Sequence, residues 1–261
     1  ILLLDKLYLS NTVGEIHYKH FKPRAKIGYL KVPKTGSGTM LNMLLRYGLK
    51  NNLNFVLPKE GIWLDGPHHF HRDMIKNTLW EKAALKYQMF VAHTRWNHEE
   101  IANILNDRDD VFYFTMLRDP VEHFISSWDF FHGRLRVKGS KNLEEYVNTE
   151  IRNDSSISAM IGQSSATIPF KYPLVNQQLY ALGMEHKDMA NITLIQTFVK
   201  NVEKLFDLVL INDGQYFKYS LLLLKNALQW EYQDMINFKQ FHKTQNKSSL
   251  SSEARTSLKG D

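Results

Sequence analysis

The chain has 261 residues, which is enough for one large α/β domain or two small ones. Hydrophobic residues make up 43% of it and charged residues 23%, so the composition excludes a disordered, collagen-like or coiled-coil protein. No apolar run reaches the ~18 residues that a membrane-spanning helix needs. Cysteine is absent, which excludes disulfides, zinc–thiolate sites and thiol nucleophiles.

The charge balance is mildly basic, with 33 Lys and Arg against 27 Asp and Glu and a formal net charge of +6. This balance favours an anionic ligand or surface, although an ordinary basic solvent-facing surface has the same composition. The basic residues are spread along the chain instead of forming a tract, so we expect no nucleic-acid partner.

The first predicted unit is a strand, a loop and a helix. Residues 1–22 lack a clear period and are expected to be a lead-in. A short apolar run from Ile27 to Val32 is typical of a buried strand. A turn rich in Gly and Ser follows over residues 33–39, and apolar residues at helical spacing between Met40 and Gly48 predict a helix.

The same pattern recurs further along the chain. The run from Met89 to Ala92 predicts a second strand, and Asn97 with Glu100 three residues later predicts a capped helix. The run from Val111 to Leu117 is the strongest strand candidate, and it leads into an aromatic-rich helix that ends near Phe131.

The second half of the chain adds two more predicted strands, at residues 192–195 and 208–211, and a long apolar helix over residues 216–238. Residues 141–165 are polar and are expected to be irregular. Strands that alternate with helices predict an α/β fold, with a P-loop-like parallel sheet flanked by helices on both faces.

No hinge-like composition divides the chain after the lead-in. We therefore expect one domain over residues 23–243. Residues 244–261, rich in Ser and Lys at their start, are expected to be a polar, loosely ordered segment of that domain.

The turn between the first predicted strand and helix has the composition of a phosphate-binding loop: Lys34, Thr35, Gly36, Ser37, Gly38 and Thr39. Glycines let the backbone approach a ligand closely, and the N–H groups of a helix start favour an anion. The motif differs from that of nucleotide triphosphatases, because Pro33 stands where a glycine would precede the lysine. An ordinary Gly/Ser turn is the alternative.

A second candidate anion site follows the strongest strand. Asp119 and Pro120 suit the start of a helix, which places Arg118 at the strand end and Ser126 about two turns later. An arginine and a hydroxyl so placed could hold one phosphate by charge-assisted hydrogen bonds. Two anion sites at strand ends suit a nucleotide with a 5′-phosphosulfate and a 3′-phosphate.

These motifs resemble those of the Golgi carbohydrate sulfotransferases. More narrowly, the chain resembles the galactose 3-O-sulfotransferase family, which includes galactosylceramide sulfotransferase. The resemblance covers about residues 26–239 and is carried by four stretches: Lys31 to Thr39, Leu41 to Gly48, Leu117 to Trp128, and Phe206 to Ile211 with Leu221 to Lys239.

The resemblance implies an enzyme, a sulfotransferase that takes a sulfuryl group from 3′-phosphoadenosine 5′-phosphosulfate and needs no metal. It implies that the 5′-phosphosulfate is held by Lys34, Thr35, Gly36, Ser37, Gly38 and Thr39, and the 3′-phosphate by Arg118 and Ser126. The implied acceptor is a carbohydrate, foremost the 3-OH of galactose in a glycolipid or glycan. The family consists of type II membrane proteins of the Golgi lumen, so an N-terminal anchor is expected to precede this chain.

Three N-x-[ST] triplets, at Asn153, Asn191 and Asn246, would permit glycosylation in that lumen.

Two residues are predicted to be catalytic. His93 follows a predicted strand, so it should lie at the same sheet edge as Lys34, and an imidazole pKa near 6.5 suits a general base. The segment around His93 also resembles a family segment whose histidine is proposed to be catalytic. Lys34 is expected to neutralise charge on the leaving phosphate. The alternative is that His93 has only a structural role at the end of its strand.

Several alternatives remain at this stage. The loop carries Pro33 where the family usually has histidine, a form closer to the uronosyl 2-O-sulfotransferases that act on glycosaminoglycans. A nucleotide-binding protein without activity is a second alternative, and a phosphoryl-transferring kinase is disfavoured. A metal site at His68, His69 and His71 is not expected, because the tract has few carboxylate partners.

Overall fold

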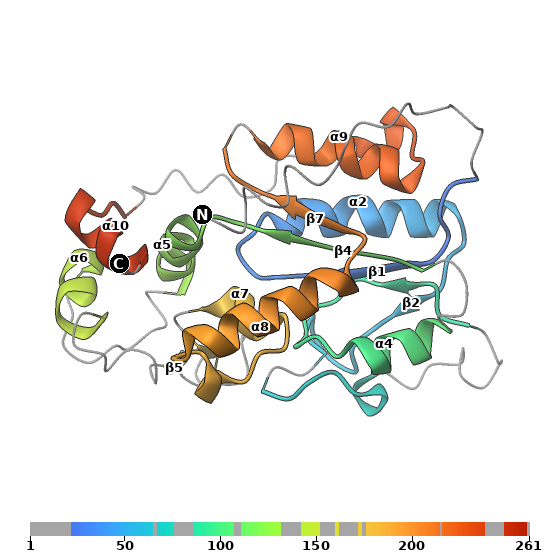
Figure 1. The fold of residues 1–261 in the computed structure, drawn as a ribbon. Coiled ribbons are helices and arrows are strands. Elements are labelled where there is room, and N and C mark those ends of the chain that lie inside the picture. Colours follow the sequence, from blue (N-terminus) through green and yellow to red (C-terminus); the bar gives the residue numbers. More distant parts are fainter. Residues whose placement is uncertain are drawn as a thin grey trace.

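The structure of the chain is a computed structural model, which describes residues 22–64, 67–75, 86–106, 111–131, 142–151, 160–161, 172–173, 176–214, 216–237 and 248–259. A central parallel sheet lies between two layers of helices (Figure 1). The predicted α/β, P-loop-like fold is therefore confirmed.

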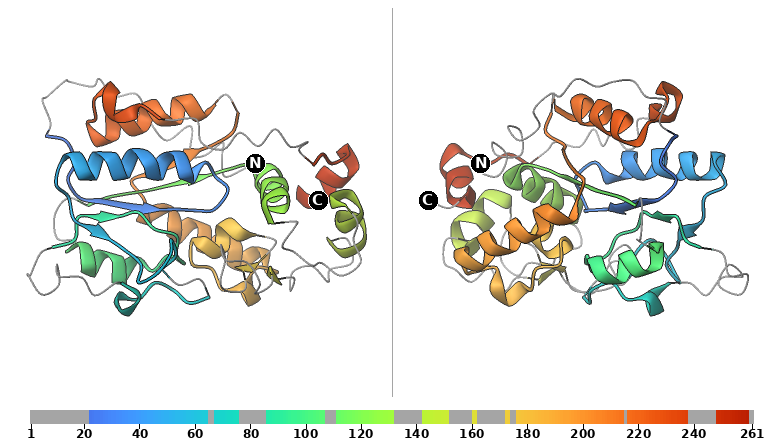
Figure 2. Two further views of the ribbon diagram at one scale, coloured as in Figure 1. Left: turned by 180° about the vertical axis from the view of Figure 1, so that it is seen from behind. Right: turned by 45° about the vertical axis from the view of Figure 1, so that its right-hand side comes forward.

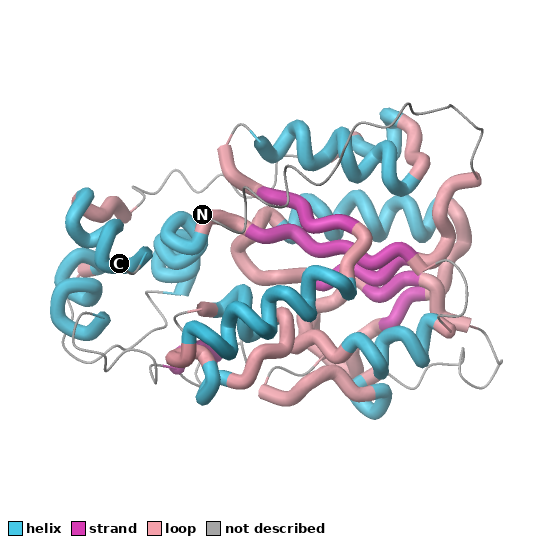
Figure 3. Tube along the Cα trace, in the orientation of Figure 1, coloured by secondary structure: helices cyan, strands magenta, loops and turns pink. Residues whose placement is uncertain are grey.

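The sheet has five strands in the order β2-β3-β1-β4-β7, and all four neighbouring pairs are parallel. The strands are β1 (Ile27–Leu30), β2 (Phe55–Val56), β3 (Met89–Phe90), β4 (Phe112–Leu117) and β7 (Leu208–Ile211). Central β1 pairs with β3 on one side and β4 on the other, so the segments that follow these three strands meet at one edge. Figure 3 shows the five strands side by side between the helices.

The described helices are α2 (Ser37–Lys50), α4 (His98–Leu105), α5 (Pro120–Phe131), α6 (Leu143–Tyr146), α7 (Gln177–Ala181), α8 (Ile192–Val202), α9 (Tyr216–Leu228) and α10 (Ser252–Lys259). Short helical turns are η1 (Arg72–Met74), η2 (Val147–Ile151), η3 (His186–Asp188), η4 (Glu203–Leu205) and η5 (Tyr232–Met235), and β5 (Met160–Ile161) pairs antiparallel with β6 (Tyr172–Pro173). None of the described helices combines the length and the apolar character that a membrane span requires.

Each face of the sheet has its own buried core. Helices α2 and α9 cover one face, where Met40, Leu44 and Leu224 pack on strand residues. Helices α4 and α8 cover the other, with Ile101 of α4 and Phe198 of α8 in its cluster. A third buried cluster joins α5, α6 and α10. Both views in Figure 2 show these helices grouped beside the sheet.

Gly28 explains how β1 and β4 pack so closely. A Cβ atom at this position would lie 2.3 Å from the ring of Tyr113 on the neighbouring strand, so the aromatic ring occupies the space that a side chain would need. The glycine is therefore a packing residue of the strand and lies outside the predicted phosphate-binding loop.

Most predicted elements are confirmed, with ends shifted by a few residues, but the helix predicted over residues 216–238 ends at Leu228 and is followed by the short turn η5. Three other predictions are wrong. Residues 192–195 begin helix α8 instead of forming a strand, because the Asn191 side chain accepts hydrogen bonds from the N–H groups of Thr193 and Leu194. The region 141–165, expected to be irregular, contains α6 and η2. Residues 252–259, expected to be loosely ordered, form α10, whose Ala254 is fully buried against α5 and α6.

Candidate functional site

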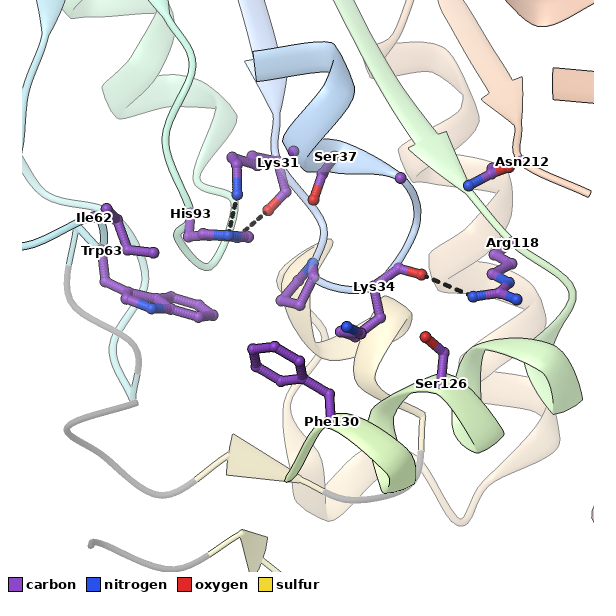
Figure 4. Close-up of a pocket in the computed structure, with 13 residues that line it drawn as sticks. Lys31, Lys34, Ser37, Ile62, Trp63, His93, Arg118, Ser126, Phe130 and Asn212 are labelled. Carbon is purple, nitrogen blue, oxygen red and sulfur yellow. Dashed lines mark hydrogen bonds between the residues drawn. The ribbon is translucent and has the colours of Figure 1, made fainter. Parts of the chain in front are cut away.

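A cleft of about 420 Å³ opens at the carboxyl ends of β1, β3, β4 and β7 (Figure 4). Its lining combines cationic, hydroxyl, amide and aromatic side chains: Lys31, Pro33, Lys34, Gly36, Ser37, Gly38, Ile62, Trp63, His93, Arg118, Ser126, Phe130 and Asn212. Six of the predicted donor-binding residues and the predicted base therefore share one cleft.

The loop between β1 and α2 has the backbone of an anion-binding turn. Lys34 has φ +62° and Gly36 has φ +84°, and Gly36 is the N-cap of the 14-residue helix α2. A lysine in the left-handed region is unusual, and such strain is concentrated at functional sites. The cap makes no side-chain hydrogen bond to the first turn of α2. The helix start therefore presents its N–H groups and positive dipole end to the cleft.

The two predicted anion sites are in contact with each other. Arg118 donates from Nη1 to the carbonyl oxygen of Lys34 at 3.3 Å. Ser126 lies on α5 and lines the same cleft. The ammonium of Lys34 rests 3.8 Å from the ring centre of Phe130. The result is one continuous cationic wall.

Two of the residues predicted to bind the phosphosulfate have side chains that lie outside the cleft. Thr35 is fully buried and donates its hydroxyl to the carbonyl of Val32 at 3.0 Å, so it stabilises the loop. Thr39 lies in the first turn of α2, where its N–H donates to the carbonyl of Gly36 at 3.1 Å. Neither side chain lines the cleft.

His93 lies three residues beyond β3 and is held on both sides of its ring by Lys31. Its Nδ1 donates to the main-chain oxygen of Lys31 at 2.6 Å, and its Nε2 contacts the side-chain nitrogen of the same lysine. The indole of Trp63 stacks on the imidazole, with ring centres 4.2 Å apart. His93 and Lys31 are both buried, at 5% and 7% exposure.

Burial changes the basicity of this pair. Desolvation, followed by the charge of Lys31, lowers the pKa of His93 well below its usual 6.5. Desolvation and the nearby charge of Lys34 lower the pKa of Lys31 to about 7. The sequence predicts an ordinary pKa for His93. The difference arises because the imidazole is buried, with Trp63 stacked on one face and Lys31 beside it.

A second histidine holds the loop from the other side. His123 of α5 donates from Nε2 to the carbonyl of Pro33 at 2.8 Å, and burial lowers its pKa to about 4. Asp119 caps α5 by accepting from the N–H groups of Val121 and Glu122, both at 3.0 Å, as the sequence predicts. Helix α5 thus fixes both Arg118 and the loop.

Sequence reasoning missed two polar residues of the cleft. The predicted strand over residues 27–32 includes Lys31, whereas β1 ends at Leu30, so Lys31 is the first residue after the observed strand. Asn212 directly follows both the predicted strand at residues 208–211 and the observed β7. Asn212 donates from Nδ2 to the carbonyl of Thr35 at 2.9 Å, which ties β7 to the loop. A rule that inspects the first polar residue after every predicted parallel strand finds Asn212, but it finds Lys31 only if the first strand is ended at Leu30.

The histidine tract at residues 68–71 makes structural hydrogen bonds and, among the residues that the structure describes, does not converge on a metal site. His69 hydrogen-bonds through Nε2 to the carbonyl of Gly183 at 2.7 Å, and His71 caps η1. Within the described ranges, no three His, Cys, Asp or Glu side chains are grouped closely enough to hold a metal ion.

Together, the parallel sheet, the glycine-containing loop and the cationic cleft at the strand ends define a P-loop-like α/β protein with a site for an anionic ligand. The family model for galactose-3-O-sulfotransferase matches residues 10–259. The chain belongs to that family.

Individual relatives agree with the family match. The chain is 27% identical to human galactosylceramide sulfotransferase over 218 residues, which cover 84% of the chain and 48% of that protein. It is 28% identical to mouse galactose-3-O-sulfotransferase 2 over 222 residues, covering 83% of the chain and 52% of the relative. It is 25% identical to mouse galactose-3-O-sulfotransferase 3 over 224 residues, covering 82% and 48%. The chain thus spans about half the length of these relatives.

Proposed function

We propose that this protein transfers a sulfuryl group from 3′-phosphoadenosine 5′-phosphosulfate to a carbohydrate hydroxyl, the 3-OH of galactose in a glycolipid or glycan. The observation that carries the proposal is the shared cleft: an anion-binding loop and Arg118 line one part of it, and a neutral, buried histidine lines another. The names of the relatives supply the acceptor sugar.

The residues fit a ligand with two anionic groups. The start of α2, Lys34 and Ser37 suit the 5′-phosphosulfate, since they offer main-chain N–H groups, an ammonium and a hydroxyl. Arg118 and Ser126 suit the 3′-phosphate on the α5 side of the cleft. Thr35 and Thr39 support the loop in this proposal and do not touch the donor.

The reaction exchanges one sulfur–oxygen bond for another. The acceptor oxygen forms a bond to sulfur while the bond between sulfur and the nucleotide phosphate oxygen breaks. The hydroxyl proton leaves toward the side of the cleft where His93 lies. Negative charge grows on the leaving phosphate, where Lys34 stabilises it; removal of such an electrostatic group typically slows a reaction by about 10²–10³-fold.

The family also guides the proposed location. We place the protein in the Golgi lumen, held by an N-terminal membrane anchor of the full-length chain, with a glycolipid or glycan as its partner. The proposal requires no metal.

The test is transfer of labelled sulfate from the donor to galactosylceramide, lactosides, N-acetyllactosamine and desulfated heparan. Lys34→Ala and His93→Ala are compared with His186→Ala, a half-buried histidine of η3 outside the cleft. We expect transfer to a galactoside that falls at least about 10²-fold in the first two variants only. Transfer to desulfated heparan alone would move the acceptor to a uronic acid. Nucleotide binding without any transfer would contradict the enzymatic proposal.

A further inference from the structure

We propose that the proton of the acceptor hydroxyl is received by Lys31, acting as a pair with His93, and not by His93 alone. This inference rests on the proposed sulfuryl transfer and names a group that the transfer needs. Lys31 is then a catalytic residue, and His93 positions its amine.

The first argument is the hydrogen bonding of the imidazole. A carbonyl oxygen can only accept, so the 2.6 Å contact with the Lys31 main chain places a proton on Nδ1 of His93. In the neutral ring, Nε2 then has no proton and accepts from the Lys31 side-chain nitrogen. Both ring nitrogens are therefore occupied by one residue. The imidazole has no second lone pair to offer to a substrate.

The second argument is access. The side chains of Lys31 and His93 both line the cleft, and Figure 4 shows the lysine directed at the ring from the loop side. A neutral amine that donates one hydrogen to Nε2 keeps its own lone pair. Trp63 covers one face of the imidazole and limits how the ring can turn away.

The third argument is the charge around the pair. Lys34 follows in the same loop, and His123 of α5 contacts that loop at Pro33. Burial in the protein interior is the largest cause of the lowered pKa in both residues, and a neighbouring cation adds to it: Lys34 acts on Lys31, and Lys31 acts on His93. About half of the Lys31 amine is unprotonated at pH 7 when its pKa is about 7, so it can accept a proton there, which an ordinary lysine does not do.

The step balances within the pair. The acceptor O–H bond breaks as its oxygen bonds to sulfur, and the proton goes to Nζ of Lys31. The resulting ammonium still donates to Nε2 of His93, so the contact between the two side chains persists through the reaction. The proton later leaves to solvent through the open cleft.

The experiment compares Lys31→Arg and Lys31→Met with the wild type. Arginine can donate to Nε2 and carries a positive charge, but it does not accept a proton in this pH range. We expect kcat to fall at least about 10²-fold in both variants, with the nucleotide Kd changed by less than about tenfold. Wild-type kcat should rise with pH between about 6 and 8. The thermal midpoints of both variants show whether each one folds.

Two outcomes would overturn the proposal. If Lys31→Arg keeps its rate, Lys31 acts as a charge. If Lys31→Met keeps its rate within about tenfold, His93 is sufficient as the base. The pH at half-maximal rate should then rise in this variant, because the charge of Lys31 no longer lowers the pKa of His93.

A readout independent of transfer separates this proposal from the proposed function. The Cε signal of Lys31 is followed by NMR through a pH titration of the nucleotide-free protein, and Lys31→Met assigns the signal. We expect a midpoint near 7. A midpoint at the ordinary lysine value of about 10.4 contradicts the pair, even if no acceptor is sulfated. A midpoint near 7 in a protein that sulfates nothing would leave the pair intact and refute only the proposed function.

Discussion

Asn212 donates from Nδ2 to the main-chain oxygen of Thr35 at 2.9 Å, and this amide lies directly against Gly36. The contact joins the end of β7 to the middle of the loop between β1 and α2. It also fills the space beside the one loop residue that caps α2. The shape of the loop is therefore set from outside, by a strand that follows it by more than 170 residues in the chain.

Replacing Gly36 with alanine tests this arrangement. A Cβ atom would lie 2.4 Å from Nδ2 of Asn212, which is a steric clash, and a φ of +84° is unfavourable for alanine. The variant is therefore destabilised in two ways. We expect a loss of about 1–3 kcal/mol in stability and weaker nucleotide binding, measured by urea unfolding and calorimetry.

The matched control is Gly61→Ala, which has φ +64° but no atom within 4 Å of the new Cβ. It should show the backbone penalty alone and unchanged nucleotide affinity. The double variant Gly36→Ala, Asn212→Ala should recover part of the loss. Equal losses in Gly36→Ala and Gly61→Ala would show that Asn212 does not constrain the loop.

The Asn191 cap accounts for the wrong strand prediction and can be tested directly. Asn191→Ala removes the acceptor for two N–H groups at the start of α8 and should cost about 0.5–2 kcal/mol of stability. Gln196→Ala, an exposed change in the middle of the same helix, should cost less than about 0.5 kcal/mol. Similar urea midpoints for the two variants would contradict the role of the cap.

The sequence alone was sufficient where the pattern is local. The β1 run, the loop and the Asp119 cap are each encoded within a few residues, and they form where the pattern predicts, although the side chains of Thr35 and Thr39 do not line the cleft. It failed at residues 192–195, where four mostly apolar residues fit a strand and a helix start equally well. The cap that decides between them is a single side chain.

The meeting of the loop with Arg118 could be predicted for a different reason. Arg118 and the loop meet because parallel strands end at one edge, which is a rule of the fold. The contact of Lys31 with His93 depends on the register between β1 and β3 and on how deeply their ends are buried. Neither quantity can be read from the residues of one segment.

The proposed role of Arg118 predicts that its replacement weakens binding of one nucleotide and not of another. Arg118→Lys keeps the charge but loses the planar fork that suits a phosphate. We expect about 10–100-fold weaker binding of 3′-phosphoadenosine 5′-phosphosulfate, and little change for adenosine 5′-phosphosulfate, which lacks the 3′-phosphate. Isothermal calorimetry at fixed salt measures both.

Ser126→Ala should show the same ligand dependence with a smaller loss, because it removes one hydroxyl from the same part of the cleft. An equal loss for both nucleotides in Arg118→Lys would instead mean that Arg118 mainly supports the loop through the carbonyl of Lys34.

His123 makes stability depend on pH. Its pKa is lowered to about 4 in the folded protein, so between pH 4 and 6.5 the unfolded chain binds a proton that the native chain does not. Stability is therefore fully present above pH 6.5 and falls as the pH drops through this window, by up to about 3 kcal/mol. His93 contributes in the same direction, because its pKa is also lowered.

His123→Gln isolates the first contribution, since an amide can still donate to the Pro33 carbonyl but does not titrate. We expect the free energy of unfolding to fall less between pH 7 and pH 5 in this variant than in the wild type, measured with urea at both values. His186→Gln, in η3 and away from the loop, should keep the wild-type difference. If His123→Gln has the wild-type pH dependence, His123 is not the buried neutral group that the geometry indicates, and the loss must come from elsewhere in the chain.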